Sequence, residues 1–304
     1  MSDALFQALP DLSKPQHCFF HQPEQYRLKV RAFSRVPPEI TVQKVDMGAD
    51  ADGYQRAWEN GQNSWGLGRK IRSEKSTQGD ESKMRAQRRA QTQVRLQTIE
   101  LAPTALVTFT TRETMTLEAL LWCWQYFTRL MRETGLQFDY VTVPERHPTN
   151  PDHLHLHAAY RGETNFKNLR RMWHIALEAR HGRRITKTLY GPEAPGNIDV
   201  QKIKSSDAVK RIRKIGKYIA KYITKDLISE FNKKRYWPSK GISLENARVY
   251  WMTSLTQADA IREACRMMGQ WDEELNLCPQ RMFRPSDRVA WVAVDPALTP
   301  PPPF

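Results

Sequence analysis

The stretch FDYVTVPERHPTNPDHLHLHAAYRG, residues 138–162, decides the fold of this chain. Residues 138–145 alternate apolar and polar side chains, and residues 153–160 do so again after a polar turn that contains Pro and Asn. Such alternation is typical of a β-strand with one buried face. Because a short loop joins the two strands, we expect them to pair in antiparallel orientation.

Outward from this pair, the pattern predicts further strands and helices in alternation. We expect a strand at residues 105–111, a helix at 117–133, a helix that begins after Thr164 or Asn165 and ends near 181, a strand at 197–203 and a basic helix at 207–231. The order strand, helix, strand, strand, helix, strand predicts a split βαβ sheet with helices on one face. The expected fold class is therefore α+β, with an antiparallel, ferredoxin-like core.

The rest of the chain divides around this core. Residues 1–100 are expected to be a basic, partly irregular N-terminal extension, residues 101–240 the core domain, and residues 241–304 a C-terminal extension with a helix near 257–270 and a Pro-rich tail. The segment SKMRAQRRAQTQVRLQ in the first extension predicts a solvated helix. Its arginines suit either phosphate binding or an ordinary surface.

The charge balance indicates a polyanionic partner. Lys and Arg number 47 against 33 Asp and Glu, which gives a formal charge of +14, and nucleic acid is the usual partner of such a chain. The longest apolar runs are too short to cross a bilayer, and no signal segment is evident at the N-terminus. We therefore expect no membrane partner and a cytoplasmic location. The four cysteines form no CxxC, so neither a zinc finger nor a disulfide framework is expected.

Three histidines alternate along the strand at residues 153–160. A period of two places His153, His155 and His157 on one face, with leucines on the other. Such histidines can be hydrogen-bonded core residues or a solvated strand face, but three on one face favour a metal site. Glu145, at the end of the preceding strand, is the expected third ligand beside His155 and His157, with His147 and His153 in reserve. Two imidazoles and one carboxylate leave coordination positions open for a phosphate oxygen.

Two tyrosines are spaced one helical turn apart in KYIAKYITKD. Tyr218 and Tyr222 should present their hydroxyls on one face of the helix, and lysines 217, 221 and 225 repeat at the same interval. Taken alone, this pattern favours an ordinary amphipathic helix, with a half-buried tyrosine face and solvated lysines, over a nucleophile. A phenol has a pKa near 10, so a nucleophilic tyrosine would need nearby cations such as Lys221.

The stretch around this helix is rich in cations that suit a DNA backbone. Tyr236 and Trp237 could stack on unpaired bases, or they could be core aromatics. The DNA-binding residues expected here are Lys214, Lys217, Lys225, Arg235 and Trp237. No GxxxxGK[ST] motif is present, so no ATP-driven unwinding is expected.

Taken together, these motifs resemble the HUH endonucleases, specifically the two-tyrosine replication initiators of rolling-circle phages and plasmids, such as the phiX174 A-like proteins. The similar motifs are a strand followed by threonines, LVTFTT; His-hydrophobic-His, HLH at 155–157 followed by AAYRG; and YIAKY at 218–222. The resemblance covers residues 105–237. His153 departs from the pattern, because it allows a second register; the residues after His157 favour the register with His155 and His157.

The resemblance implies a reaction and its partners. Tyr218 or Tyr222 would attack a phosphate of single-stranded or supercoiled origin DNA with the help of Mg²⁺ or Mn²⁺ and of Lys221, and would form a 5′-phosphotyrosine link. A host helicase and a DNA polymerase would then carry out rolling-circle replication. A two-tyrosine transposase or a relaxase would share this chemistry. A non-catalytic basic protein that binds nucleic acid is the alternative from another class.

Overall fold

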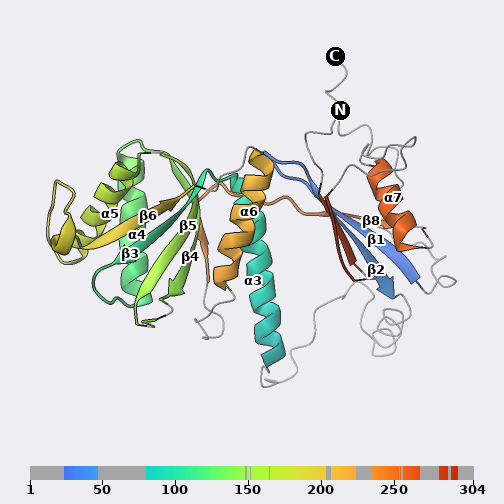
Figure 1. The fold of residues 1–304 in the computed structure, drawn as a ribbon, viewed down its shortest axis with the longest axis horizontal. Helices are drawn as coiled ribbons and strands as arrows, with labels where there is room; N and C mark the ends of the chain where they lie inside the picture. The colour runs from blue at the N-terminus through green and yellow to red at the C-terminus, as the bar shows by residue number, and fades with distance from the viewer. Residues whose placement is uncertain are drawn as a thin grey trace, which may run out of the picture. The chain divides into compact units, whose positions relative to one another are not determined.

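The computed structural model describes residues 24–46, 80–147, 149–150, 152–163, 165–202, 207–223, 235–252, 254, 256–267, 281–286 and 289–293. The fold is α+β, with two five-stranded antiparallel sheets (Figure 1). The chain divides into two compact units. The first combines Met1–Lys75 with Glu245–Phe304, and the second is Ser76–Leu244.

The sheet of the second unit has the strand order β6-β3-β5-β4-β7. The expected antiparallel pair is present, and β3 separates β5 from β6 while β5 separates β3 from β4. All neighbouring strands of this sheet are antiparallel. The strands are β3 (Ala105–Thr111), β4 (Phe138–Arg146), β5 (Leu154–Gly162), β6 (Gly196–Gln201) and β7 (Trp237–Pro238).

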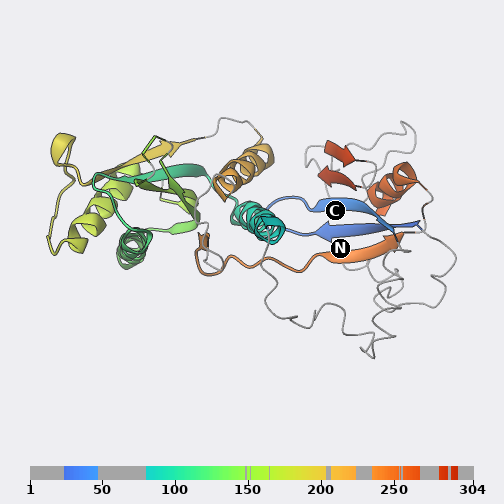
Figure 2. The same cartoon turned by 90° about the horizontal axis from the view of Figure 1, so that it is seen from below.

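Two helices, α4 (Leu117–Glu133) and α5 (Phe166–Arg180), cover one face of this sheet and pack on each other (Figures 1 and 2). The expected N-cap Asn165 accepts a hydrogen bond from the backbone N–H of Lys167, which satisfies one of the free donors at the helix start. Phe109 is fully buried at the centre of this core, with edge-to-face contacts to Trp124 and Trp173. The shared core holds the sheet against α4 and α5.

The opposite face is covered as well, by α3 (Asp80–Leu101) and α6 (Ala208–Ala220), which pack on each other. The prediction of helices on one face is therefore wrong for the unit as a whole. The physical reason is that the second face of the sheet is also apolar, so it too must be removed from water. Its buried residues are Leu106, Val141, Val143 and Ala159, which form a core with Val94, Leu101, Ile215 and Ile219.

The basic helix is shorter than predicted. The α-helix ends at Ala220, and a 3-10 turn, η3 (Lys221–Ile223), follows. The backbone N–H of Lys221 contacts the carbonyl of Tyr218, the tighter spacing of a 3-10 turn. The remainder of the predicted helix, including Lys225, lies outside the described residues.

In the first unit, the two predicted extensions form one sheet, with strand order β8-β1-β2-β10-β9. One face of this sheet packs on α7 (Gln257–Met267), which was predicted, whereas the strands were not. Sequence reasoning also placed α3 in the N-terminal extension, but it belongs to the second unit. The strands are β1 (Glu24–Arg31), β2 (Glu39–Asp46), β8 (Arg248–Met252), β9 (Arg281–Ser286) and β10 (Val289–Ala293).

Two expectations about composition can be compared with the structure. Among the described helices, none is long and apolar enough to cross a membrane. Cys123 is a buried free thiol, as expected. Cys265 instead takes part in a disulfide, which the sequence analysis did not expect.

Candidate functional site

Strand pairing brings Glu145, His155 and His157 to one place on the sheet. Glu145 lies directly opposite His155 in the β4–β5 register, and Val143 lies opposite His157. All three predicted ligands occupy the face that α3 and α6 cover, because they alternate with residues of the α4–α5 core. The predicted grouping of these residues is thus present.

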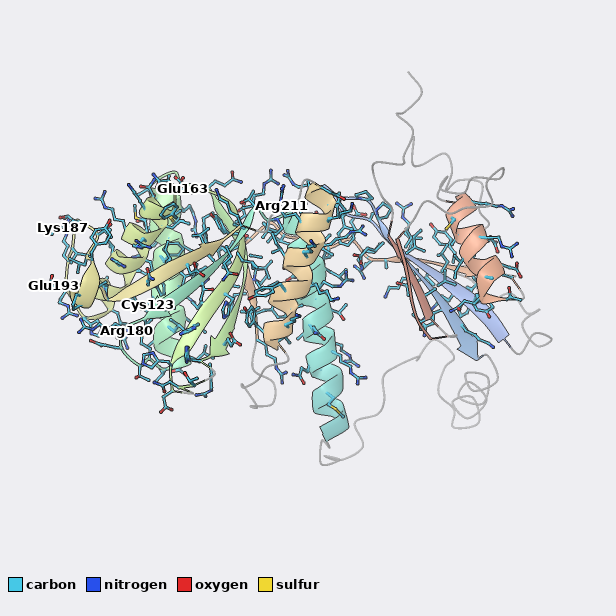
Figure 3. The ribbon with its side chains drawn as sticks, viewed as in Figure 1. Cys123, Glu163, Arg180, Lys187, Glu193 and Arg211 are labelled. Carbon is cyan, nitrogen blue, oxygen red and sulfur yellow. The ribbon has the colours of Figure 1, made fainter. Side chains whose placement is uncertain are left out.

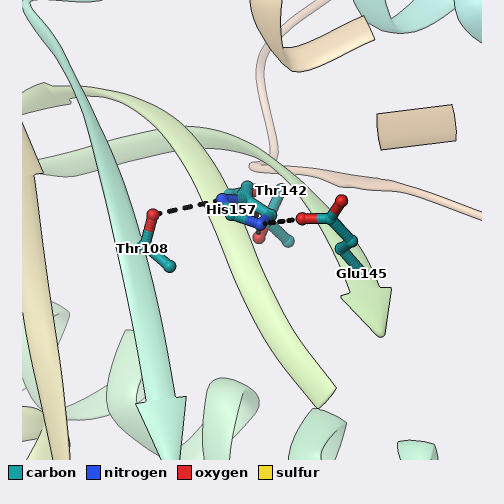
Figure 4. A network of polar contacts seen from close by, with 4 residues as sticks. All are labelled: Thr108, Thr142, Glu145 and His157. Atoms are coloured by element: carbon teal, nitrogen blue, oxygen red, sulfur yellow. Dashed lines mark hydrogen bonds and ion pairs between the residues drawn. The ribbon is translucent and has the colours of Figure 1, made fainter. Parts of the chain in front are cut away.

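His157 is held by polar groups at both ring nitrogens (Figure 4). Its Nε2 lies 2.7 Å from Oε2 of Glu145, and its Nδ1 lies 3.1 Å from Oγ1 of Thr108. Thr142 donates its hydroxyl to the backbone carbonyl of His157 at 3.0 Å. Because a hydroxyl can both donate and accept a hydrogen bond, Thr108 can hold His157 in either neutral tautomer. These contacts fix the plane of the imidazole ring.

His155 lies next to His157, in a different environment. Its ring centroid lies 6.4 Å from that of His157 and 5.0 Å from that of His147. Burial lowers the pKa of His155, and the neighbouring His147 and His157 lower it further. The ring is therefore kept neutral more readily than a solvated histidine, and a neutral imidazole is the form that binds a metal.

The donor set suits a divalent cation, but its arrangement in the structure does not form a metal centre. Two of the expected ligands, Glu145 and His157, are hydrogen-bonded to each other. Within the described residues, no group of three His, Cys, Asp or Glu side chains is arranged to hold a metal ion. Two imidazoles and a carboxylate are nevertheless common metal ligands. Binding through all three would require the hydrogen bond between Glu145 and His157 to open.

Both tyrosines lie beside these histidines, in unlike environments. The ring of Tyr222 is parallel to that of His157, with centroids 3.8 Å apart, and it meets the ring of Tyr218 edge to face at 5.4 Å. Tyr222 is half-buried, and burial raises its pKa well above the usual value, with further contributions from Tyr218 and Glu145. Tyr218 is 38% exposed. The two tyrosine rings thus lie next to each other, but Tyr222 is half-buried and Tyr218 is exposed.

The other predicted site residues that the structure describes are the lysines on and just after α6, Arg235 and Trp237. Lys221 is an exposed residue at the end of α6, and Lys214 and Lys217 are exposed on that helix. Arg235 is half-buried. Trp237 is half-buried in β7, where it pairs with Thr142. Trp237 is therefore a residue of the sheet, not of a loop.

Sequence reasoning gave His153 a place on the histidine face, but the strand begins one residue later. The Nε2 of His153 lies 3.4 Å from Oγ1 of Thr114, so the structure directs this ring toward the β3–α4 loop. Conversely, sequence reasoning missed Thr108 and Thr142. The β3–β5 register pairs Thr108 with His157. Because β3 contains three threonines, the local sequence does not single out Thr108.

Basic side chains are also present away from α6. Figure 3 shows Arg180 at the end of α5 and Lys187 in the loop that follows, both in the second unit. Both are exposed. The guanidinium group of Arg180 lies 5.9 Å from the ring centroid of Trp122 on α4. The positive charge of the second unit is therefore spread over several elements.

Comparisons with known proteins identify no relative. No protein-family model matches the chain, and no curated protein and no solved structure matches it with significance.

Proposed function

We propose that this protein is an HUH-type endonuclease that nicks and religates single-stranded DNA through a tyrosine and initiates rolling-circle replication. The observation that carries the proposal is the contact between Tyr222 and His157, at 3.8 Å between ring centroids. Residues distant in sequence, and of the types that a tyrosine-mediated strand transfer needs, come together at one place. An ordinary amphipathic helix would not require a histidine pair and a carboxylate beneath its tyrosines.

The connectivity of the second sheet supports the proposal. Four of its five strands, in the order β6-β3-β5-β4 with antiparallel neighbours, are compatible with a ferredoxin-like sheet. In this arrangement the histidine strand β5 is central, and a helix that carries the tyrosines can cover it. Fold alone does not establish chemistry, so the proposal depends on the side chains.

The reaction is a transesterification. The hydroxyl oxygen of Tyr218 or Tyr222 forms a bond to the scissile phosphorus, and the bond between that phosphorus and the 3′ oxygen breaks. The tyrosine gives up its proton and the leaving 3′ oxygen takes one, so that a 5′-phosphotyrosine and a 3′-hydroxyl result. The phosphodiester bond energy is retained, and the reverse attack by a 3′-hydroxyl religates the strand. Two tyrosines provide one nucleophile for the first cut and another for the terminating cut.

Residues of this chain would supply the surroundings of that reaction. A divalent cation, Mg²⁺ or Mn²⁺, held by His155, His157 and Glu145 would neutralise charge on the phosphate. Thr108 and the ring of Tyr222 orient His157. Lys221 supplies positive charge beside Tyr222, and Lys214 and Lys217 extend a basic surface along α6 for the DNA backbone.

The proposal includes the partners that such an initiator uses. Single-stranded or supercoiled origin DNA in the cytoplasm would be the substrate. A host helicase would open the duplex, and a polymerase would extend the 3′-hydroxyl. A transposase or relaxase would perform the same chemistry, and would differ in what happens to the joined ends.

Covalent trapping tests the proposal. The full chain is incubated with a random-sequence single-stranded DNA library and Mn²⁺, and DNA that resists SDS is sequenced while the linked peptide is identified by mass spectrometry. We expect an adduct on Tyr218 or Tyr222. The double variant Tyr218→Phe/Tyr222→Phe should form none. The matched control Tyr126→Phe/Tyr190→Phe removes two hydroxyls elsewhere in the same unit and should form the adduct normally.

Two results would contradict the proposal. An adduct found on another residue, or one that persists in the double variant, would show that the tyrosines of α6 and η3 are not the nucleophiles. Tight DNA binding with no adduct under any metal condition would favour the non-catalytic binding protein instead.

A further inference from the structure

The first unit carries a row of cations on one face of its sheet. Along β1, Arg27, Lys29 and Arg31 alternate with Tyr26, Leu28 and Val30, and the latter three are buried in the core of the unit. Side chains at alternate positions of a strand are about 6.6 Å apart. The three cations therefore form a straight row on the face opposite the core. Their spacing is comparable to that of successive phosphates on a nucleic-acid strand.

Neutral residues flank Arg27 and Lys29 in this row, and an acidic residue lies opposite Arg31. Trp251 on β8 lies in register with Arg27, and Val249 lies in register with Lys29. On the other side, Gln43 and Thr41 of β2 lie opposite Arg27 and Lys29, and the buried carboxylate residue Glu39 lies opposite Arg31. Val249 is 45% exposed, and Trp251 is half-buried. We call this set of residues, Arg27, Lys29, Arg31, Thr41, Gln43, Val249 and Trp251, the β1 face.

The charges of the β1 face are close together, with neutral partners for their hydrogen bonds. Arg27 donates to Oε1 of Gln43 at 2.6 Å, and Arg31 donates to the backbone carbonyl of Glu245 at 3.0 Å. Lys29 is exposed. Burial lowers the pKa of Lys29, and the positive charges of Arg31 and Arg27 lower it further. Like charges at this spacing are destabilising unless an anion joins them.

The β1 face lies on the opposite side of the sheet from α7. The helix packs through Ala260, Ala264 and Cys265 against Leu28 and Val42, on the core side. Figure 1 shows α7 beside one side of the β1–β2 sheet. Among the described residues, no helix packs on this face. A sheet face that presents cations in a row next to an aromatic ring is suited to a single strand, because its phosphates meet the cations and an unpaired base can stack.

We propose that the β1 face binds single-stranded DNA. This inference assigns a role to the first unit, to which the proposed nicking reaction assigns none, and it does not depend on that reaction. A duplex would present its phosphates as well, but its bases are already stacked and would not use Trp251. The expected contacts are Arg27 and Lys29 with successive phosphates and Trp251 with a base.

Binding measured by fluorescence anisotropy tests the inference. The full chain carries Tyr218→Phe/Tyr222→Phe, so that no cleavage occurs, and the probe is a labelled oligo-dT at several salt concentrations. Arg27→Gln/Lys29→Gln should reduce the slope of log K against log salt by about 1.4, since each single-strand phosphate contact contributes about 0.7. Trp251→Ala should weaken binding by about 5- to 150-fold, the effect of losing one stacked base.

A control variant in the same unit separates this effect from a general loss of charge. Arg262→Gln/Arg266→Gln removes two exposed cations from α7, on the other side of the sheet, and should leave the slope unchanged. Lys29→Glu changes an exposed side chain, so it tests the charge even if the Arg27 variant unfolds. Thermal melting identifies any variant that has unfolded.

The outcomes distinguish this inference from the proposed nicking activity. If the β1-face variants bind DNA with the wild-type slope and affinity, the inference is overturned, whether or not the wild-type chain forms a covalent adduct. If they leave oligo-dT binding unchanged and weaken only the binding of a labelled duplex of the same length, the assignment to a single strand is overturned. If they weaken single-strand binding and the wild-type chain forms no adduct, the β1 face stands and the nicking proposal fails.

Discussion

The ring of Tyr222 lies parallel to the imidazole of His157, with an interplanar angle of 1°. This stack connects the turn after α6 to the central strand β5, although 65 positions of chain separate the two residues (222 − 157). The imidazole is fixed by the ring stacked on its face and by Thr108 and Glu145 at its edges. The geometry of the histidine site thus depends on the tyrosine segment.

Replacing the ring of Tyr222 should therefore lower the stability of the protein as well as remove a nucleophile. Tyr222→Phe keeps the stack, whereas Tyr222→Leu removes it, and we expect the leucine variant to be less stable than the phenylalanine variant by about 0.5–1.5 kcal/mol. Urea unfolding of both variants measures the difference. Equal stabilities would show that the stack contributes nothing to the free energy of unfolding.

Thr108 should be a positioning residue for His157. Thr108→Val keeps the shape of the side chain and removes the hydroxyl, and we expect metal affinity and nicking to fall about 10- to 100-fold, as for other outer-shell partners. Manganese binding, followed by electron paramagnetic resonance, measures the first effect. Thr108→Ser should restore both. Thr110→Val is the matched control on the same strand, because the hydroxyl of Thr110 contacts the backbone of Asn197 instead.

Removing the carboxylate of Glu145 should weaken metal binding and leave DNA binding intact. We expect Glu145→Ala to lose at least the tenfold in manganese affinity that an outer-shell change costs. DNA affinity should persist because it depends on the spread basic surface. Glu163→Ala, at the other end of β5, is the control. A Glu145→Ala variant with wild-type manganese affinity would exclude this residue as a ligand.

Acid should destabilise the second unit through His174. This buried side chain donates from Nε2 to the carbonyl of Gly196 at 2.9 Å, and burial lowers its pKa from the ordinary value of 6.5. Near and below pH 6.5 the unfolded chain therefore binds more protons than the folded chain. The contribution of His174 to stability is complete above pH 6.5 and is lost as the pH falls through the folded pKa of His174. His174→Gln should flatten the stability profile below pH 6.5, measured by urea unfolding. His181→Gln, at an exposed position, is the control, and an unchanged profile for His174→Gln would exclude this residue as the cause.

The end of the histidine strand should not tolerate a side chain at Gly162. The residue has φ +131°, and a Cβ there would overlap the carbonyl oxygen of Gln137. We expect Gly162→Ala to lower the free energy of unfolding by about 2–4 kcal/mol, from backbone strain and the clash together. Gly182→Ala provides the comparison, because Gly182 also has positive φ but has open space around it. Similar thermal unfolding of the two variants would contradict the role of the clash.

The sequence by itself predicted four of the five strands of the second sheet, but not β7. The bounds 105–111 and 117–133 are those of β3 and α4, because alternation and helical periodicity are local properties of the chain. It also predicted that Glu145 would lie beside the histidines. A short connection between two strands leaves few ways to pair them.

Only the tertiary structure decided the rest. The β1 strand pairs with β8, and Thr108 meets His157, because of contacts between segments that are distant in the chain, and no local pattern specifies such partners. The unequal burial of Tyr218 and Tyr222 also depends on what packs above each ring. Local periodicity determines which face of an element is apolar. Which other element covers that face follows from the packing of the whole chain, since burial of apolar surface has no direction of its own.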